Sequence, residues 1–298
     1  MRDFSADHRW LSINTATLRG VGKLDAIIEA CARHGIRAIS PWRDQVAAIG
    51  LGRTAELMRA HGLELSGYCR GGMFCAVDAA GRQAALDDNR RAIDEAKMLN
   101  AACLVLVVGG LPGALAGTPH SKDIASARRV VHDGIAATLD YAREVGMPRA
   151  IEPLHPMYAA DRACVNTMEQ ALDLCDALDP PPTGAPGDEP SNGAALGVAV
   201  DVYHVWWDPK LEAQIARAGR DRLLALHVCD WLVNTRDLLE DRGMMGDGVI
   251  ELSRIRRWLE AAGFAGYSEV EIFSSRDWWQ RPADEVLLTC IERHRSAV

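Results

Sequence analysis

The sequence predicts an α/β fold, a (β/α)8 TIM barrel formed by a single domain over residues 1–298. Short β-rich segments alternate with longer amphipathic segments along the chain, which favours a parallel sheet covered by helices. Eight strand–helix units fit into 298 residues, the count and size typical of such a barrel. The alternative is a doubly wound open sheet. That architecture typically has a GxGxxG turn after its first strand, and the segment NTATLRGVG at the end of the first expected strand lacks this turn.

The expected elements follow one another regularly. The strands are predicted at 11–17, 36–42, 63–69, 103–110, 149–154, 196–207, 223–230 and 266–273. The helices are predicted near 23–35, 44–61, 81–100, 121–146, 167–178, 209–219, 251–262 and 282–294. The fourth strand, CLVLVVGG, is continuously apolar, as expected of a strand buried on both faces. Glycines at positions 35, 62 and 146 mark three helix ends.

One segment interrupts this alternation. DPPPTGAPGDEPSNG, at 179–193, is rich in proline and glycine and predicts neither helix nor strand. Because the alternation resumes after it, we interpret it as a surface insertion rather than a domain linker.

The composition narrows the function classes. A formal net charge of −8 disfavours a nucleic-acid partner, because binding to polyphosphate is driven by basic side chains. No apolar run approaches the roughly 20 residues of a membrane span, and the N-terminus lacks a signal-peptide pattern. None of the eight cysteines forms a CxxC pair. We therefore expect reduced thiols in a cytoplasmic protein without a membrane partner.

Polar residues gather at the ends of the last four predicted strands. In a barrel the active site lies at the carboxyl ends of the strands. The residues found there are Glu152, His155, Asp201, His204, His227, Asp230 and Glu271. Such an oxygen-rich set with imidazole suits Mn²⁺, Mg²⁺ or Co²⁺, with Zn²⁺ as a further option. A metal would also explain a carboxylate inside the apolar run EVEIF, because a buried carboxylate needs a cation or a hydrogen-bond network.

Two further features suggest substrate contacts. The loop at 231–249 is long for a compact domain, and long loops are often functional. It carries Arg242 close to Gly246 and Gly248, so the arginine could fold over the site and hold a substrate oxygen. Tryptophans at predicted strand ends, among them Trp231 beside Asp230, suit stacking on a sugar ring or an aromatic aglycone.

The order Glu152, Asp201-x-x-His204, His227-x-x-Asp230, Arg242 with Gly246-x-Gly248, and Glu271 resembles the xylose isomerase-like (β/α)8 superfamily. More narrowly, it is similar to the sugar phosphate isomerase/epimerase group. The resemblance implies that Glu152, Asp201, His227 and Glu271 bind one divalent metal, with Mn²⁺ the expected ion, and that His204 and Arg242 contact substrate. It implies an isomerase or epimerase of a ketose, keto-sugar or inositol-like ketone. Glu152 and Glu271 would transfer protons next to a metal-polarised carbonyl.

His155 departs from the epimerase pattern. A Glu-x-x-His at this place is similar to the barrel subunit of bacterial C-glycoside deglycosidases. Those lyases eliminate the aglycone from a 3-keto glycoside and work with a small β-rich partner subunit. This alternative would make His155 the catalytic base and the assembly a heteromer. The isomerase interpretation instead implies a homo-oligomer.

The DNA-repair branch of the superfamily resembles the chain less, because no histidine follows the third or fourth predicted strand. A sugar-binding module without chemistry is disfavoured because none of the four implied ligands is missing. No glycine-rich phosphate cradle is evident, so a free sugar, inositol-like ketone or keto-glycoside is the expected substrate.

Overall fold

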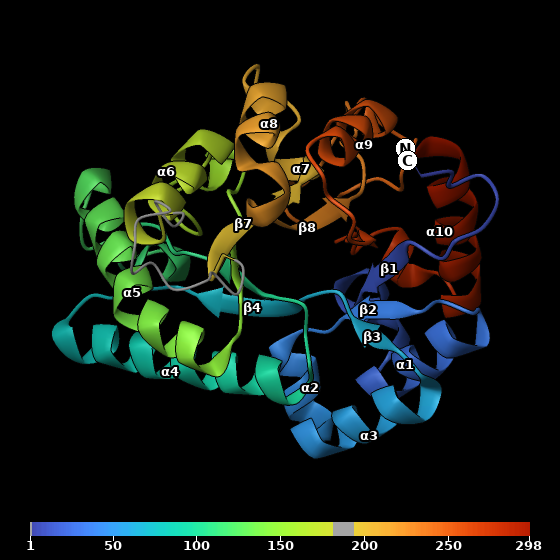
Figure 1. Cartoon of the computed structure of the whole chain (residues 1–298), viewed down its shortest axis with the longest axis horizontal. Coiled ribbons are helices and arrows are strands. Elements are labelled where there is room, and N and C mark those ends of the chain that lie inside the picture. The colour runs from blue at the N-terminus through green and yellow to red at the C-terminus, as the bar shows by residue number, and fades with distance from the viewer. Residues whose placement is uncertain (1, 181–193) are drawn as a thin grey trace, which may run out of the picture.

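The computed structural model describes residues 2–180 and 194–298, so most of the predicted 179–193 insertion lies outside the described residues. Its strands form one parallel sheet in the order β3-β2-β1-β9-β8-β7-β6-β5-β4. Helices surround this sheet, and the two described ends of the chain lie close together (Figure 1). The predicted barrel is confirmed.

The nine strand segments correspond to eight barrel positions because the third predicted strand is split. β3 (Glu64–Leu65) pairs with β2, and β4 (Tyr68–Gly72) pairs with β5. Ser66 and Gly67 separate the two halves. The backbone N–H of Ala102 donates to Leu65, and that of Tyr68 donates to Cys103, so both halves contact the fourth barrel position. These bonds nearly close the barrel.

The other strands are shorter than predicted. They are β1 (Leu11–Asn14), β2 (Ala38–Ser40), β5 (Leu104–Val107), β6 (Arg149–Ile151), β7 (Leu196–Asp201), β8 (Leu223–Val228) and β9 (Ser268–Val270). β1 ends where the Asn14 side chain accepts a hydrogen bond from the Ala16 N–H and caps the 3-10 helix η1 (Thr15–Val21). β7 ends in the same way, because Asp201 caps the short helix α7 (Val202–Val205). Asparagine and aspartate side chains favour such caps, which accounts for the early strand ends.

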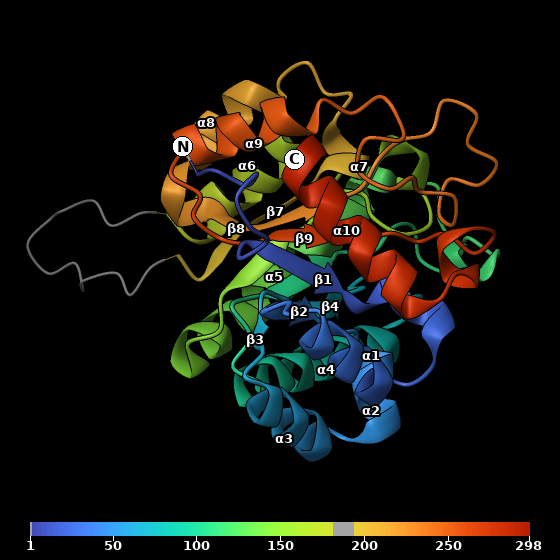
Figure 2. The same ribbon diagram turned by 90° about the vertical axis from the view of Figure 1, so that its right-hand side faces the viewer.

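The outer helices lie close to the predicted positions in the sequence. Figure 2 shows them packed around the sheet. They are α1 (Leu24–Arg33), α2 (Arg43–Ile49), α3 (Leu51–His61), α4 (Ala79–Met98), α5 (Ile124–Val145), α6 (Met168–Leu178), α8 (Leu211–Arg222), α9 (Leu252–Ala261) and α10 (Ala283–Ala297). The one predicted helix at 44–61 is instead two helices. They meet at Gly50, whose φ of 93° suits glycine and ends α2.

The apolar core separates into two parts. The larger part packs helices against the outer face of the sheet, as α1 does with Leu24, Ile27, Ile28 and Cys31 at helical spacing. A smaller cluster of mostly small side chains comes from successive strands: Cys69, Cys103, Val105, Ala150, Ala199 and Ala225. Small side chains on these strands leave space for the buried polar groups described below.

No disulfide links the eight cysteines, which lie within the described residues, and Cys75 is the one that is not fully buried. Among the described residues, no helix combines the length and the apolar character needed to cross a membrane.

Candidate active site

Four predicted metal-ligand residues meet at the carboxyl ends of consecutive strands. Glu152 follows β6, Asp201 ends β7, His227 lies in β8 and Glu271 follows β9. Each offers one ligand atom, and these atoms all lie within 4.8 Å of one another. All four side chains are buried. Parallel barrel strands bring their carboxyl ends together, so residues up to 119 positions apart in sequence could hold one ion.

With its three carboxylates ionised, this ligand group carries more negative charge than the neighbouring arginine compensates. Three carboxylates face one arginine, Arg242, whose Nη1 donates to Asp201 Oδ2 at 2.9 Å and to Glu271 Oε2 at 3.1 Å. Burial raises the pKa of Glu271 to about 8, although Arg242 and His227 oppose the shift. Buried carboxylates in excess of nearby positive charge are costly. A divalent ion would supply the missing charge, and the oxygen-rich donor set fits it.

Burial opposes protonation of His227, but the carboxylates of Glu269, Glu152 and Glu271 outweigh this effect and raise its pKa well above the usual value. His227 Nδ1 lies 2.7 Å from Glu152 Oε1. In the absence of metal, a proton on the imidazole therefore takes up part of the negative charge. A metal would replace that proton, because a histidine ligand binds metal in its deprotonated form.

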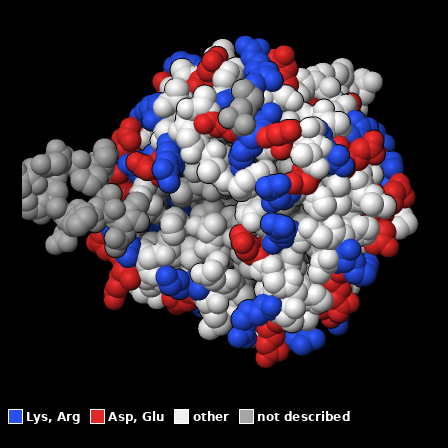
Figure 3. Space-filling model, turned by 45° about the vertical axis from the view of Figure 1, so that its right-hand side comes forward, with Lys and Arg blue, Asp and Glu red and all other residues white. Residues whose placement is uncertain are grey.

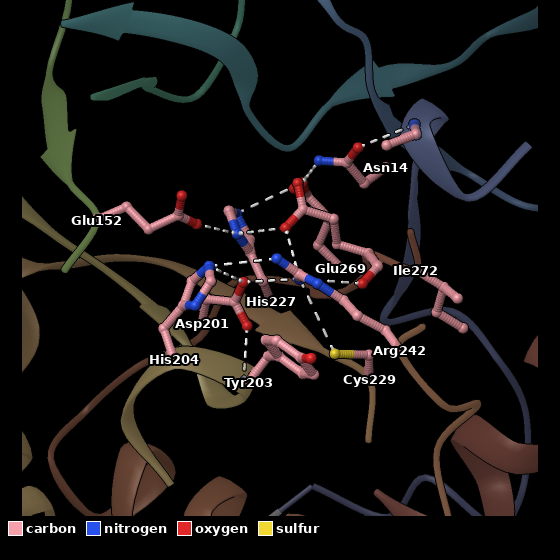
Figure 4. Close-up of polar contacts among 12 residues, drawn as sticks. Asn14, Glu152, Asp201, Tyr203, His204, His227, Cys229, Arg242, Glu269 and Ile272 are labelled. Atoms are coloured by element: carbon pink, nitrogen blue, oxygen red, sulfur yellow. Dashed lines mark hydrogen bonds and ion pairs between the residues drawn. The ribbon is translucent and has the colours of Figure 1, made fainter. Parts of the chain in front are cut away.

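Arg242 lies deeper than the sequence suggested. Its side chain is only 3% exposed, and its guanidinium lies 4.5 Å from the ring centre of Tyr203 and 5.0 Å from that of Phe273. Its Nη2 lies 3.2 Å from His204 Nε2. Burial lowers the pKa of His204 to about 3, so the imidazole is neutral and can accept this bond. The two predicted substrate contacts, His204 and Arg242, are thus fixed beside the ligand group (Figure 4).

A cavity opens directly above these residues. Its interior has a volume of about 140 Å³. Its polar lining consists of Arg70, Glu152, Arg162, His204, Arg242 and Glu271. Trp42, Tyr158 and Phe273 supply aromatic walls. Of the tryptophans predicted at strand ends, which are Trp42, Trp206, Trp207 and Trp231, Trp42 lines the cavity.

The other predicted site residues lie outside the cavity lining. The His155 ring stacks on Trp231 at 4.9 Å between ring centres, and Trp207 meets it edge-on at 5.8 Å. Trp231 also packs against Tyr203 at 4.8 Å. Asp230 is fully buried, and its carboxylate accepts the backbone N–H groups of Trp231, Gly246 and Ile250. Asp230 therefore anchors the long loop after β8, while His155 and Trp231 belong to an aromatic cluster.

Comparison with known proteins now identifies the family. The model of the xylose isomerase-like TIM barrel family matches residues 28–290. The chain belongs to this family. No match was found among curated proteins.

Three solved structures illustrate the range of this xylose isomerase-like barrel. Protein SMc04130 from Sinorhizobium meliloti 1021 is 60% identical, with a TM-score of 0.88 over 97% of this chain and 98% of its own. The IOLI protein with a bound zinc atom is 21% identical, with a TM-score of 0.77 and 94% of each chain covered. D-allulose 3-epimerase from Methylomonas sp. is 17% identical, with a TM-score of 0.70 over 98% of this chain and 99% of its own. At such identities the last two show the fold alone.

Glu269 is a site residue that the sequence interpretation missed. It lies two residues before Glu271 in the EVEIF segment and, like Glu271, points into the barrel, because residues two apart share one face of a strand. Its Oε1 accepts a hydrogen bond from Asn14 Nδ2 at 2.8 Å, and its Oε2 accepts one from Ser66 Oγ at 2.7 Å. The E-x-E spacing of Glu269 and Glu271 was the sequence signal that could have identified Glu269 as a site residue.

Glu269 also links the ligand group to the cavity wall. His227 Nε2 lies 3.5 Å from Glu269 Oε1, while His227 Nδ1 faces Glu152 and Glu271 (Figure 4). Asn14 Oδ1 in turn accepts a hydrogen bond from Trp42 Nε1 at 2.7 Å. A carboxylate on the far nitrogen of a metal-binding imidazole fixes the ring orientation and tautomer. Glu269 is placed to do this for His227.

Proposed function

We propose that this protein is a divalent-metal-dependent isomerase or epimerase that acts on a ketose, keto-sugar or inositol-like ketone. One observation carries the proposal: Glu152 and Glu271 belong to the ligand group and also line the cavity. When bound, the metal would polarise the substrate carbonyl and acidify the neighbouring C–H bond. The carboxylates are then positioned to move that proton.

Glu152 and Glu271 follow β6 and β9, which are separated in the sheet by β7 and β8. They therefore reach the cavity from different strands. One carboxylate takes the proton from the carbon next to the carbonyl, and the other returns a proton to the same or the adjacent carbon. The outcome is epimerisation in the first case and isomerisation in the second.

The surrounding residues orient the substrate and limit access of water. Arg242 and neutral His204 present hydrogen-bonding groups beside the two carboxylates and can hold a substrate hydroxyl or ketone oxygen. The rings of Trp42, Tyr158 and Phe273 form an apolar wall against which a sugar ring can pack.

The comparisons support a sugar substrate and a divalent ion. The IOLI protein carries a zinc atom, and D-allulose 3-epimerase is named for an epimerisation of a ketose. For this chain we keep Mn²⁺ as the proposed ion, because carboxylate oxygens dominate the donor set, with Zn²⁺, Mg²⁺ and Co²⁺ as alternatives. A homo-oligomer belongs to this proposal.

Elimination from a 3-keto glycoside finds less support in the geometry. A base acting in that reaction must reach the substrate. His155 is stacked against Trp231 and is not among the residues that line the cavity.

Proton exchange with solvent tests the proposal. The Mn²⁺-loaded protein would be incubated in D₂O with D-fructose, 3-keto-glucose, an inosose and a 3-keto C-glycoside and followed by NMR. We expect deuterium next to the ketone together with a rearranged sugar. Release of an aglycone by the wild type but not by His155→Phe would instead assign the elimination. The heteromer with a small β-rich subunit belongs to that alternative.

Glu152→Gln should lose both bound metal and exchange. The matched control is Glu56→Gln on α3, where the side chain is 62% exposed. A Glu152→Gln protein that keeps its metal and its exchange rate would contradict the proposed role of this residue.

A further inference from the structure

We propose that the substrate carries an anionic group, a carboxylate or a phosphate, which Arg70 and Arg162 bind inside the cavity. The inference deepens the proposed function, since it names the substrate class of the same site. It concerns binding, so it can be tested separately from proton transfer.

Arg70 is the first of the two arginines. It lies in β4 and lines the cavity beside Met73 and Val107, with its guanidinium 6.0 Å from the ring centre of Trp42. Within residues 2–180 and 194–298, no carboxylate lies within 4.0 Å of it and no side-chain or backbone acceptor binds its guanidinium. Burial lowers its pKa, and the charge of Arg162 adds to this effect. The more distant carboxylates of Glu152 and Asp44 oppose this shift. A partly desolvated cation without a close counter-charge is costly unless an anion binds to it.

Neighbouring arginines outside the cavity have carboxylate partners. Arg19 pairs with Asp44 at 2.8 Å, and Arg43 pairs with Asp88 at 2.8 Å. Basic and acidic side chains also lie side by side over much of the face shown in Figure 3. Arg70 differs from these ion-paired arginines by facing the cavity without a carboxylate partner.

Arg162 is the second arginine. It lies in the segment between β6 and α6 and lines the same cavity, with its guanidinium 5.8 Å from the ring centre of Tyr158. Its one carboxylate neighbour among the described residues is Asp161 at 3.6 Å, and its buried Nε has no hydrogen-bond partner there. Two guanidinium groups on one cavity repel each other unless an anion lies between them. Planar guanidinium groups match carboxylate and phosphate oxygens.

The charge of Arg242 is already compensated within the protein, because its Nη1 is bound to two carboxylates, those of Asp201 and Glu271. The cavity therefore has two chemically different parts. Glu152 and Glu271 border the reacting carbon, and Arg70 and Arg162 bind a charged substituent of the same molecule. Guanidinium groups bind phosphate without a glycine-rich loop, so the missing phosphate cradle does not require an uncharged sugar.

Calorimetric titration of the Mn²⁺-loaded protein tests the inference with D-glucitol, D-gluconate and D-glucitol 6-phosphate. We expect at least one anion to bind about tenfold or more tightly than glucitol, as a charged hydrogen bond would give. Tighter binding of gluconate would indicate a carboxylate, and tighter binding of the phosphate would indicate a phosphate ester. Arg70→Gln and Arg162→Gln should each remove about tenfold of the anion affinity without changing glucitol binding.

Two controls separate charge from folding. Arg70→Lys keeps the charge and should retain part of the anion affinity, while Arg53→Gln on α3, with a side chain 58% exposed, should retain all of it. Equal affinities for glucitol and both anions in the wild-type protein would overturn the inference, whatever the variants do. Unchanged anion affinity in both Arg70→Gln and Arg162→Gln would overturn it as well.

Deuterium exchange separates the two proposals. Exchange into D-fructose, without any preference for D-fructose 6-phosphate or D-fructuronate, would leave the isomerase proposal standing and reject the anion site. Anion binding that depends on the two arginines, without exchange into any of the three sugars, would support the anion site and reject the isomerase proposal.

Discussion

Replacing Glu271 with glutamine should change how the stability of the metal-free protein depends on pH. Burial raises the pKa of Glu271 from 4.5 to about 8 in the folded protein. Between these values the folded state holds a proton that the unfolded state has released. The free energy of unfolding therefore falls as pH rises through this window. Glutamine is close to the same size and cannot ionise, so the variant should lose this dependence.

The effect is measured between pH 5 and 6.5 as the difference between wild type and variant, because groups such as His204, whose pKa is lowered to about 3 in the folded state, add the same slope to both proteins. His227 also has a raised pKa in the folded state, but below its unfolded value of 6.5 it is protonated in both states and adds no slope. One proton over 1.5 pH units corresponds to about 2 kcal/mol, which for a domain of 298 residues is a melting-temperature change of about 3 °C.

Thermal unfolding followed by circular dichroism at pH 5, 5.5, 6 and 6.5 in EDTA provides the assay. The melting temperature of the wild type should fall across this series relative to Glu271→Gln. Glu56→Gln, with its exposed side chain, should follow the wild type. Parallel curves for wild type and Glu271→Gln would show that the pKa of the Glu271 carboxyl group is not raised in the folded protein.

Three further outcomes are expected. Glu269→Gln should weaken Mn²⁺ binding about 10- to 100-fold by equilibrium dialysis, because it removes the carboxylate beside His227 Nε2; unchanged affinity would reject that orienting role. Saturating Mn²⁺ at about 100 times its dissociation constant should stabilise the wild type by about 2.7 kcal/mol, and Asp201→Asn should lose most of this gain in thermal melts. Asp230→Asn should destabilise the fold by about 1.5–3 kcal/mol, since the Asp230 carboxylate binds three backbone N–H groups. The substitution should also expose the loop at 231–249 to limited proteolysis. A cleavage pattern like that of the wild type would argue against the role of Asp230 as the anchor of this loop.

Much of the ligand group could be predicted because it follows from topology. In a parallel barrel each strand ends on the same side, so acidic and imidazole side chains at the ends of β6, β7, β8 and β9 are brought to one end of the barrel, where they can converge. The alternation of strands and helices that establishes this topology is local and visible in the sequence. The break at Gly50 and the split between β3 and β4 were missed because one or two residues decide them.

The roles of other residues depended on side-chain direction. His155 lies three residues from Glu152, yet its ring stacks on Trp231 outside the cavity lining. Asp230 lies at a strand end but binds the backbone of its own loop. Proximity in sequence cannot distinguish these arrangements, because a short change of backbone direction after a strand reorients each side chain.

The sequence by itself predicted the barrel and seven polar residues at its strand ends, since the alternation of strands and helices is a local pattern, and the family resemblance singled out four of them as ligands of a divalent ion. Only the tertiary structure decided which polar groups share the cavity. Glu269 lies beneath His227, Arg242 is bound to Asp201 and Glu271, and Arg70 and Arg162 face the cavity without a close carboxylate partner among the described residues. These arrangements join side chains from distant strands, and whether a charge is paired depends on neighbours that packing alone brings together.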